Sequence, residues 1–89
     1  MLSAAEKKSL KARAHKLEPV VMIGTKGITD EVVKEVALAL KAHELIKVRA
    51  AALEREAREA ALQTLCERTG ADAVQAIGKV FVIYRKRDE

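Results

Sequence analysis

The chain has little of what disulfides, metal sites and membrane spans require. Its 89 residues include one cysteine and two histidines, so Cys66 cannot form an internal disulfide and no zinc-ligand spacing occurs. No segment approaches the roughly 20 apolar residues that cross a bilayer, and the N-terminus lacks the apolar core of a secretory signal. We therefore expect no metal, no cofactor, no membrane association and a cytoplasmic location.

The motifs of common enzymes are missing as well. No GxxxxGK[ST] loop and no GxGxxG fingerprint occurs, and no pairing of histidine with cysteine suggests an activated nucleophile. Most acidic residues alternate with basic residues on predicted helices, as on a solvated surface. We expect neither catalysis nor a small-molecule substrate.

The composition supports one small core, and the charge is concentrated at one end. With 49% hydrophobic residues, residues 1–89 are predicted to form a single domain. The net charge is +4, and residues 1–28 hold six basic residues against two acids, whereas the remainder is balanced. This asymmetry indicates an anionic partner for the N-terminal part.

A GxxG loop lies between an apolar run and an amphipathic segment, and consists of Gly24, Thr25, Lys26 and Gly27. Glycines let a backbone approach a ligand closely and adopt positive φ, while a following helix start offers unpaired amides. Such a loop can hold phosphates, with Lys26 adding a mobile cation. The alternative is an ordinary strand-to-helix turn in which the glycines only relieve strain.

Hydrophobic periodicity predicts three helices and four strands. The helices are expected at 3–16, from a cap at Thr29 to near His43, and at 54–69; the strands are expected at 19–23, 45–50, 73–77 and 80–84. Helical crossovers imply parallel pairing of the first three strands, with the fourth antiparallel. The predicted fold is α/β (α+β), a two-layer sandwich with a four-stranded mixed sheet whose other face is open; the pattern does not place the first helix.

Several burial states follow from the same patterns. The apolar strand at 19–23 is expected to be buried, and the third helix is expected to bury Ala57, Ala61, Leu62, Leu65 and Cys66. Gly78 and Lys79 suit a type II′ hairpin turn. Residues 85–89 are expected to fray.

Further cationic side chains are candidates for contact with an anion. Lys8, Lys11 and His15 form a stripe on the first helix, and Lys47 and Arg49 point away from the predicted core. Lys79 occupies the hairpin turn. Each of these groups can also be a solvated surface without any function.

Four segments together resemble the CRM domain, the chloroplast RNA splicing and ribosome maturation domain; they are 16–29, 43–48, 69–71 and 77–79. The small size resembles the stand-alone bacterial YhbY-type members. The resemblance implies a fold similar to the C-terminal domain of translation initiation factor three. It also implies RNA binding through the GxxG loop, as in KH domains, and an association with precursors of the large ribosomal subunit.

The sequence thus predicts a monomeric protein that binds ribosomal RNA of large-subunit precursors. Phe81 and Tyr84 are the only aromatic residues and are expected in the core or at the sheet edge. Contacts to phosphate and 2′-hydroxyl groups are therefore favoured over stacking on aromatic rings. The alternative is a protein-interaction module that docks a ribosomal or assembly protein through its open sheet face.

Overall fold

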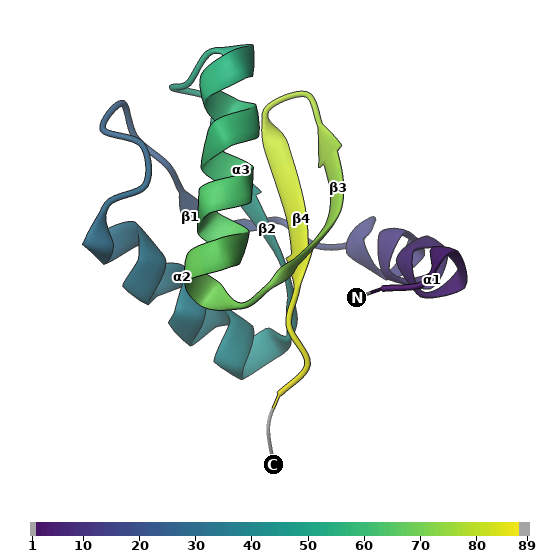
Figure 1. The fold of residues 1–89 in the computed structure, drawn as a ribbon. Coiled ribbons are helices and arrows are strands. Elements are labelled where there is room, and N and C mark those ends of the chain that lie inside the picture. Colours follow the sequence, from purple (N-terminus) through teal and green to yellow (C-terminus); the bar gives the residue numbers. More distant parts are fainter. Residues whose placement is uncertain (1, 88–89) are drawn as a thin grey trace.

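Three helices and four strands alternate along the chain in the predicted order (Figure 1). The computed structural model describes residues 2–87. The elements are α1 (Ala4–Ala14), β1 (Pro19–Met22), α2 (Asp30–His43), β2 (Leu45–Arg49), α3 (Arg55–Thr69), β3 (Asp72–Ile77) and β4 (Val80–Tyr84). Among the helices of this described part, none is long and apolar enough to cross a membrane.

Side-chain caps explain where two of the helices begin. Ser3 and Glu6 form a reciprocal capping box at the start of α1, and the hydrogen bond from the Ser3 backbone amide is the main cause that lowers the pKa of Glu6. Thr29 caps α2 by accepting a hydrogen bond from the Val32 amide over 3.2 Å. The residue before α3, Glu54, makes no side-chain cap.

The sheet has the order β1-β2-β4-β3, which corrects one predicted pairing. β1 and β2 are parallel neighbours, as expected, but β3 does not pair with β2. Instead β4 lies between them and is antiparallel to both. The short turn at Gly78 and Lys79 brings β4 back beside β3, and β4 thereby occupies the central position next to β2. Gly78 has φ +56° and Lys79 has no positive φ, as a type II′ turn requires.

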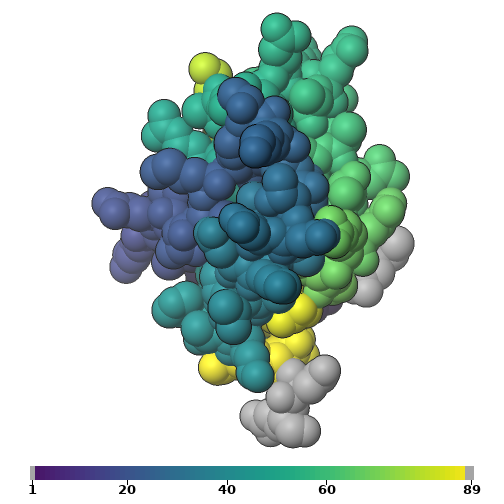
Figure 2. Space-filling view, turned by 90° about the vertical axis from the view of Figure 1, so that its left-hand side faces the viewer, coloured from purple at the N-terminus to yellow at the C-terminus, as the bar shows by residue number. Residues whose placement is uncertain are grey.

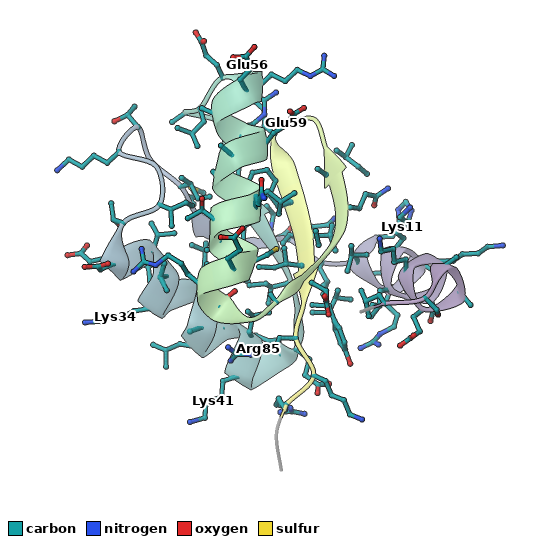
Figure 3. All side chains as sticks on the ribbon, viewed as in Figure 1. Lys11, Lys34, Lys41, Glu56, Glu59 and Arg85 are labelled. Atoms are coloured by element: carbon teal, nitrogen blue, oxygen red, sulfur yellow. The ribbon has the colours of Figure 1, made fainter. Side chains whose placement is uncertain are left out.

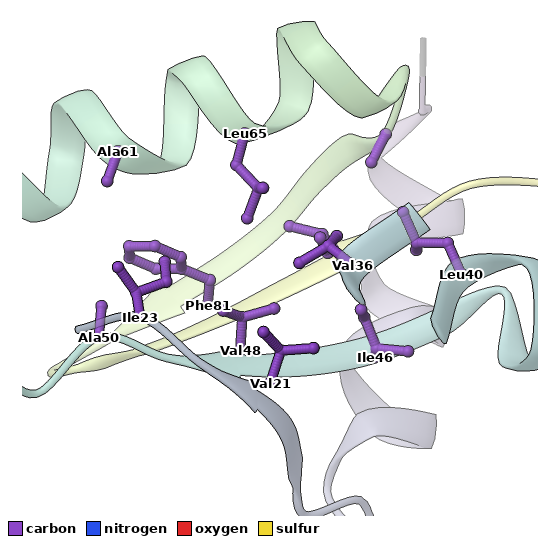
Figure 4. Close-up of a cluster of buried hydrophobic side chains, with 12 residues drawn as sticks. Val21, Ile23, Val36, Leu40, Ile46, Val48, Ala50, Ala61, Leu65 and Phe81 are labelled. Carbon is purple, nitrogen blue, oxygen red and sulfur yellow. The ribbon is translucent and has the colours of Figure 1, made fainter. Parts of the chain in front are cut away.

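One face of the sheet is covered by α2 and α3 and holds the larger core (Figure 4). Ile46 and Val48 of β2 and Phe81 of β4 contribute to it from the sheet, and Val36 and Leu65 from the helices. Ile46, Val48 and Ala50 point to this face, while Lys47 and Arg49 are not part of it. The strand period in the sequence therefore predicted the two faces of β2 correctly.

The other face is covered in part by α1. Leu10 and Ala14 pack with Leu45, Val74 and Val82 in a second, smaller hydrophobic cluster. Figure 1 shows α1 on the opposite side of the sheet from α2 and α3. The face that the sequence predicts as open is therefore covered at one end, and only the end toward the β3–β4 turn stays exposed.

Two predicted burial states are corrected by the structure. Ala57 is exposed, because the first turn of α3 extends beyond the β3–β4 turn and has no sheet beneath it (Figure 1). In β1, Val21 and Ile23 beyond its end are buried, but Val20 and Met22 are exposed, since this edge strand is covered on one face only. Cys66 is partly exposed and packs against the larger core.

The chain after β4 is fastened to the helices and does not fray up to residue 87. The guanidinium of Arg85 donates to the carbonyl oxygen of Thr69 over 2.7 Å and to that of Ala37 over 3.3 Å. The Arg87 amide donates to the Glu44 carboxylate over 2.8 Å. The first two bonds use carbonyl groups at the end of α3 and within α2, and the third uses the side chain of the residue after α2, so these contacts tie the chain to the helices as far as residue 87. Residues 88–89 of the expected frayed end lie outside the described part.

Candidate nucleic-acid interface

The segment Gly24–Gly27 forms a tight turn between β1 and α2. The amide of Gly27 donates a hydrogen bond to the carbonyl oxygen of Gly24 over 3.0 Å, the i to i+3 bond of a β-turn. Gly27 has φ +72°, a conformation that costs a residue with a Cβ atom roughly 1–2 kcal/mol. The local backbone therefore favours glycine at this position, whether or not a ligand binds.

The same turn is accessible from solvent. Gly24, Thr25 and Lys26 are exposed, and a Cβ atom added at Gly24 or Gly27 would meet nothing within 4 Å. Figure 2 faces this side of the molecule, where the blue atoms of the loop lie at the surface next to α2. Within residues 2–87, the amides of Thr25 and Lys26 donate to no protein acceptor. A ligand backbone can therefore reach two free amides and one ammonium group.

The start of α2 contributes less positive potential than a bare helix end. Its first turn carries Asp30 and Glu31, whose carboxylates offset the partial charge of the helix dipole. Asp30 is paired with Arg68 of α3, with the carboxylate oxygen 2.7 Å from a guanidinium nitrogen. Attraction of a phosphate to the loop therefore depends mainly on its own amides and on Lys26.

Backbone hydrogen bonds hold the loop beside two other predicted site residues. The Ile23 amide donates to the Arg49 carbonyl oxygen over 2.8 Å, and the Ala50 amide donates to the Lys79 carbonyl oxygen over 2.7 Å. The end of β1, the end of β2 and the β3–β4 turn therefore lie at one end of the sheet. Arg49 and Lys79 belong to the same end as the GxxG loop.

The strand register arranges the partly open face in two rows across the sheet. The first, which we call the loop-end row, contains Met22, Arg49, Val80 and Ile77. The second, which we call the middle row, contains Pro19, Lys47, Val82 and Gln75. Arg49 and Lys47 are two residues apart on one strand, so both point to the face that α1 partly covers.

A groove between α1 and the sheet brings three of the predicted site residues together. It has a volume of about 230 Å³, and Lys11, His15 and Lys47 line it together with the rest of the middle row. Figure 3 shows Lys11 on the side of α1 toward the β3–β4 turn. None of the residues lining this groove is acidic. The groove is thus a cationic hollow that continues from the loop-end row.

The predicted site residues therefore fall into two groups. The GxxG loop, Arg49 and Lys79 share one end of the sheet, and the groove collects Lys11, His15 and Lys47. The two groups are joined by β2, which carries both Lys47 and Arg49. Lys8 is exposed on the same stripe of α1 but does not line the groove.

Three residues of this face have no cationic character and were not predicted from the sequence. Met22 and Ile77 are exposed to 71% and 60% at the two ends of the loop-end row. Gln75 lies half-buried in the middle row, and none of the side-chain hydrogen bonds within residues 2–87 involves it. The sequence carries no signal for the exposure of Met22, because an unbroken apolar run is typical of a strand that is buried on both faces.

A second cationic patch lies at the opposite end of α2. Lys41, Lys86 and Arg87 surround a hollow beside Arg85, far from the loop at the start of that helix. Figure 3 shows Lys41 and Arg85 near the end of β4 that leads to the C-terminus. Two of these residues already bond to protein: Arg85 to helix carbonyls and Arg87 to Glu44.

The single thiol does not have the features of a reactive group. Burial, reinforced by the nearby carboxylate of Asp72, raises the pKa of the Cys66 thiol. A raised pKa leaves less thiolate at neutral pH, and the thiolate is the nucleophilic form. In the part of the chain that the structure describes, no group of three or more potential ligands could hold a metal ion.

Comparison with known proteins identifies relatives along nearly the whole chain. The model of the CRS1 / YhbY (CRM) domain matches residues 2–85. An RNA-binding protein of Haemophilus influenzae is 43% identical over 88 residues, which cover 99% of this chain and 89% of the relative. A "probable RNA-binding protein" of Pseudomonas aeruginosa is 44% identical over 85 residues, covering 96% of this chain and 82% of the relative.

A solved structure has the same fold. The solution structure of a hypothetical protein from Staphylococcus aureus, described as an RNA-binding candidate, superposes with a TM-score of 0.88 at 35% identity. It covers 100% of this chain, and this chain covers 93% of it. The family match, the identities and the superposition agree with one another, and the chain therefore belongs to the CRS1 / YhbY (CRM) domain family.

Proposed function

We propose that this protein binds RNA, and that its target is ribosomal RNA in precursors of the large ribosomal subunit. The observation that carries the proposal is the exposed Gly24–Gly27 turn, with its free amides and Lys26, placed beside Arg49 and Lys79. Relatives with more than 40% identity are named as RNA-binding proteins, which supports the same ligand. In this proposal the protein acts as a cytoplasmic monomer without catalysis.

The chemistry of the loop suits the sugar–phosphate backbone of RNA. Phosphate oxygens accept hydrogen bonds from backbone amides and lysine, and such contacts position a nucleic acid without reading its sequence. The cations of the groove and of the hairpin turn can follow the backbone away from the loop. The single domain of residues 1–89 would then hold folded ribosomal RNA mainly through its backbone.

Crosslinking in cells, followed by sequencing of the attached RNA, tests both the target and the loop. We expect the wild-type protein to recover large-subunit ribosomal RNA, and the Lys26→Glu and Gly24→Val variants to recover much less. Because Gly24 has open space around it, a valine there should leave the fold intact. Lys41→Glu is the matched control, since it makes the same charge change in the last turn of α2.

Two results would contradict the proposal. Recovery of messenger RNA or small RNA in place of ribosomal RNA would reject the target. Equal losses in the Lys26→Glu and Lys41→Glu variants would reject the loop assignment. Crosslinks to a ribosomal or assembly protein, without RNA, would instead support docking through the partly open sheet face.

A further inference from the structure

We propose that the groove between α1 and the sheet binds an unpaired nucleobase of the RNA strand whose backbone the GxxG loop holds. This inference rests on the proposed function, because it assigns a second contact to the same bound strand. The groove has a volume of about 230 Å³ and lies next to the exposed loop-end row. It therefore offers a hollow for a flat group beside a surface for the backbone.

The lining of the groove combines apolar walls with one neutral polar group. Ala14, Pro19, Val80 and Val82 present apolar surface, and Gln75 presents a carboxamide. None of the side-chain hydrogen bonds within residues 2–87 involves Gln75, so the donor and the acceptor of this carboxamide are both free. An amide can pair with the donor and acceptor groups on the edge of a base, which a phosphate cannot match.

The route from the loop to the groove crosses the loop-end row. Met22 comes two residues before Gly24, and its exposed side chain begins a row that ends at the exposed Ile77 of β3. The four strands of the row are separated by three spacings, about 14 Å in all. A short stretch of RNA can therefore span from the loop to the groove, with its bases against the exposed apolar side chains.

Charge complementarity favours a nucleic acid strand over a protein at this face. Lys11, His15 and Lys47 line the groove, no acid lines it, and Arg49 stands in the adjoining row. An occupant must then carry many negative charges and also flat or apolar groups. An unpaired RNA strand carries both in every nucleotide.

The test compares two probes that differ only in their bases. One is a single-stranded oligoribonucleotide of mixed sequence, and the other is the abasic oligomer of the same length. Fluorescence anisotropy gives the dissociation constant of each probe for the full chain and its variants. We expect the wild-type protein to bind the base-containing probe at least about fivefold more tightly, since one additional hydrogen-bonded contact contributes about that much.

Two variants and two matched controls locate the contact. Gln75→Leu removes the carboxamide, and Gln63→Leu makes the same change at the exposed surface of α3. Ile77→Ser removes an exposed apolar side chain, and Leu38→Ser does the same on α2, where Leu38 is 69% exposed. The groove variants should weaken binding of the base-containing probe by about fivefold and leave the abasic probe unchanged, because each removes one hydrogen bond or one apolar contact to the base. The controls should change neither.

The outcomes separate this inference from the proposed function. Wild-type binding that is equally tight for both probes would overturn the nucleobase site and leave backbone binding by the loop standing. The same would follow if Gln75→Leu and Ile77→Ser matched their controls. No binding of either probe would overturn the nucleobase site and the binding of a single-stranded backbone by the loop, whereas the ribosomal RNA target is tested separately by crosslinking.

Discussion

Arg85, which follows β4, is bonded to α3, to the interior of α2 and to the residue after α2 through its side chain and its own amide. The guanidinium bonds the Thr69 carbonyl at the end of α3 and the Ala37 carbonyl in α2, and the Arg85 amide donates to the Glu44 carbonyl over 2.9 Å. The side chain is partly buried, so its loss leaves carbonyl groups with fewer partners.

We predict that Arg85→Ala lowers the free energy of unfolding by about 1.5–3 kcal/mol, the range for hydrogen bonds to charged groups. Urea denaturation monitored by circular dichroism measures the change. Lys86→Ala, at an exposed position next to it, should change stability by no more than about 0.5 kcal/mol. Equal stabilities of the two variants would show that the guanidinium contacts do not contribute.

The roles of some single residues could be predicted from the sequence, and those of others could not. The turn glycines and the outward direction of Lys47 and Arg49 follow from local pattern, because strand period and positive φ depend on neighbours in the chain. Arg85 could not be predicted, since its partners are 16 and 48 residues away. Gln75 was missed because nothing in its neighbourhood distinguishes a groove from solvent.

At the scale of elements, the junction between α2 and β2 contains a strained residue. Glu44 has φ +63° and ψ −46°, outside the regions that residues with a Cβ atom prefer. Its carboxylate bonds the Arg87 amide, and its carbonyl bonds the Arg85 amide. These two hydrogen bonds stabilise the unfavourable backbone conformation of Glu44 in the folded protein.

We predict that Glu44→Gly is more stable than Glu44→Ala by about 1 kcal/mol. Both variants lose the carboxylate. Glycine relieves a backbone strain of about 1–3 kcal/mol, which stabilises the folded state. Glycine also makes the unfolded chain more flexible, which lowers the free energy of unfolding by about 0.4–1 kcal/mol relative to alanine. Thermal or urea unfolding of the Glu44→Gly and Glu44→Ala variants measures the difference in their free energies of unfolding. An alanine variant as stable as the glycine variant would mean that the backbone at this junction is not strained.

Element types and boundaries were predicted well, whereas strand neighbours were not. Caps at Ser3 and Thr29 and the turn at Gly78 are local signals, so they mark the ends of elements in the sequence. The position of β4 between β2 and β3 depends on which strand the hairpin returns to. An order with β3 beside β2 and an order with β4 beside β2 satisfy the same local sequence pattern. Only packing across the whole sheet distinguishes these two orders.

At the scale of the whole molecule, the placement of α1 decides the shape of the candidate interface. Leu10 and Ala14 are only two buried positions, too few for the sequence to show which surface they cover. By packing over Leu45, Val74 and Val82, the helix closes one end of the open face and creates the groove. The interface thus combines a loop that the sequence identifies with a hollow that only the fold produces.

The central claim is that the GxxG loop holds phosphates, and the salt dependence of RNA binding tests it most directly. We predict that the logarithm of the binding constant falls with the logarithm of salt concentration. For a single strand, Lys26→Ala should reduce the size of this slope by about 0.7, because one phosphate contact is lost. Lys41→Ala should leave the slope unchanged. A wild-type slope near zero, or a slope that Lys41→Ala reduces and Lys26→Ala does not, would contradict the account.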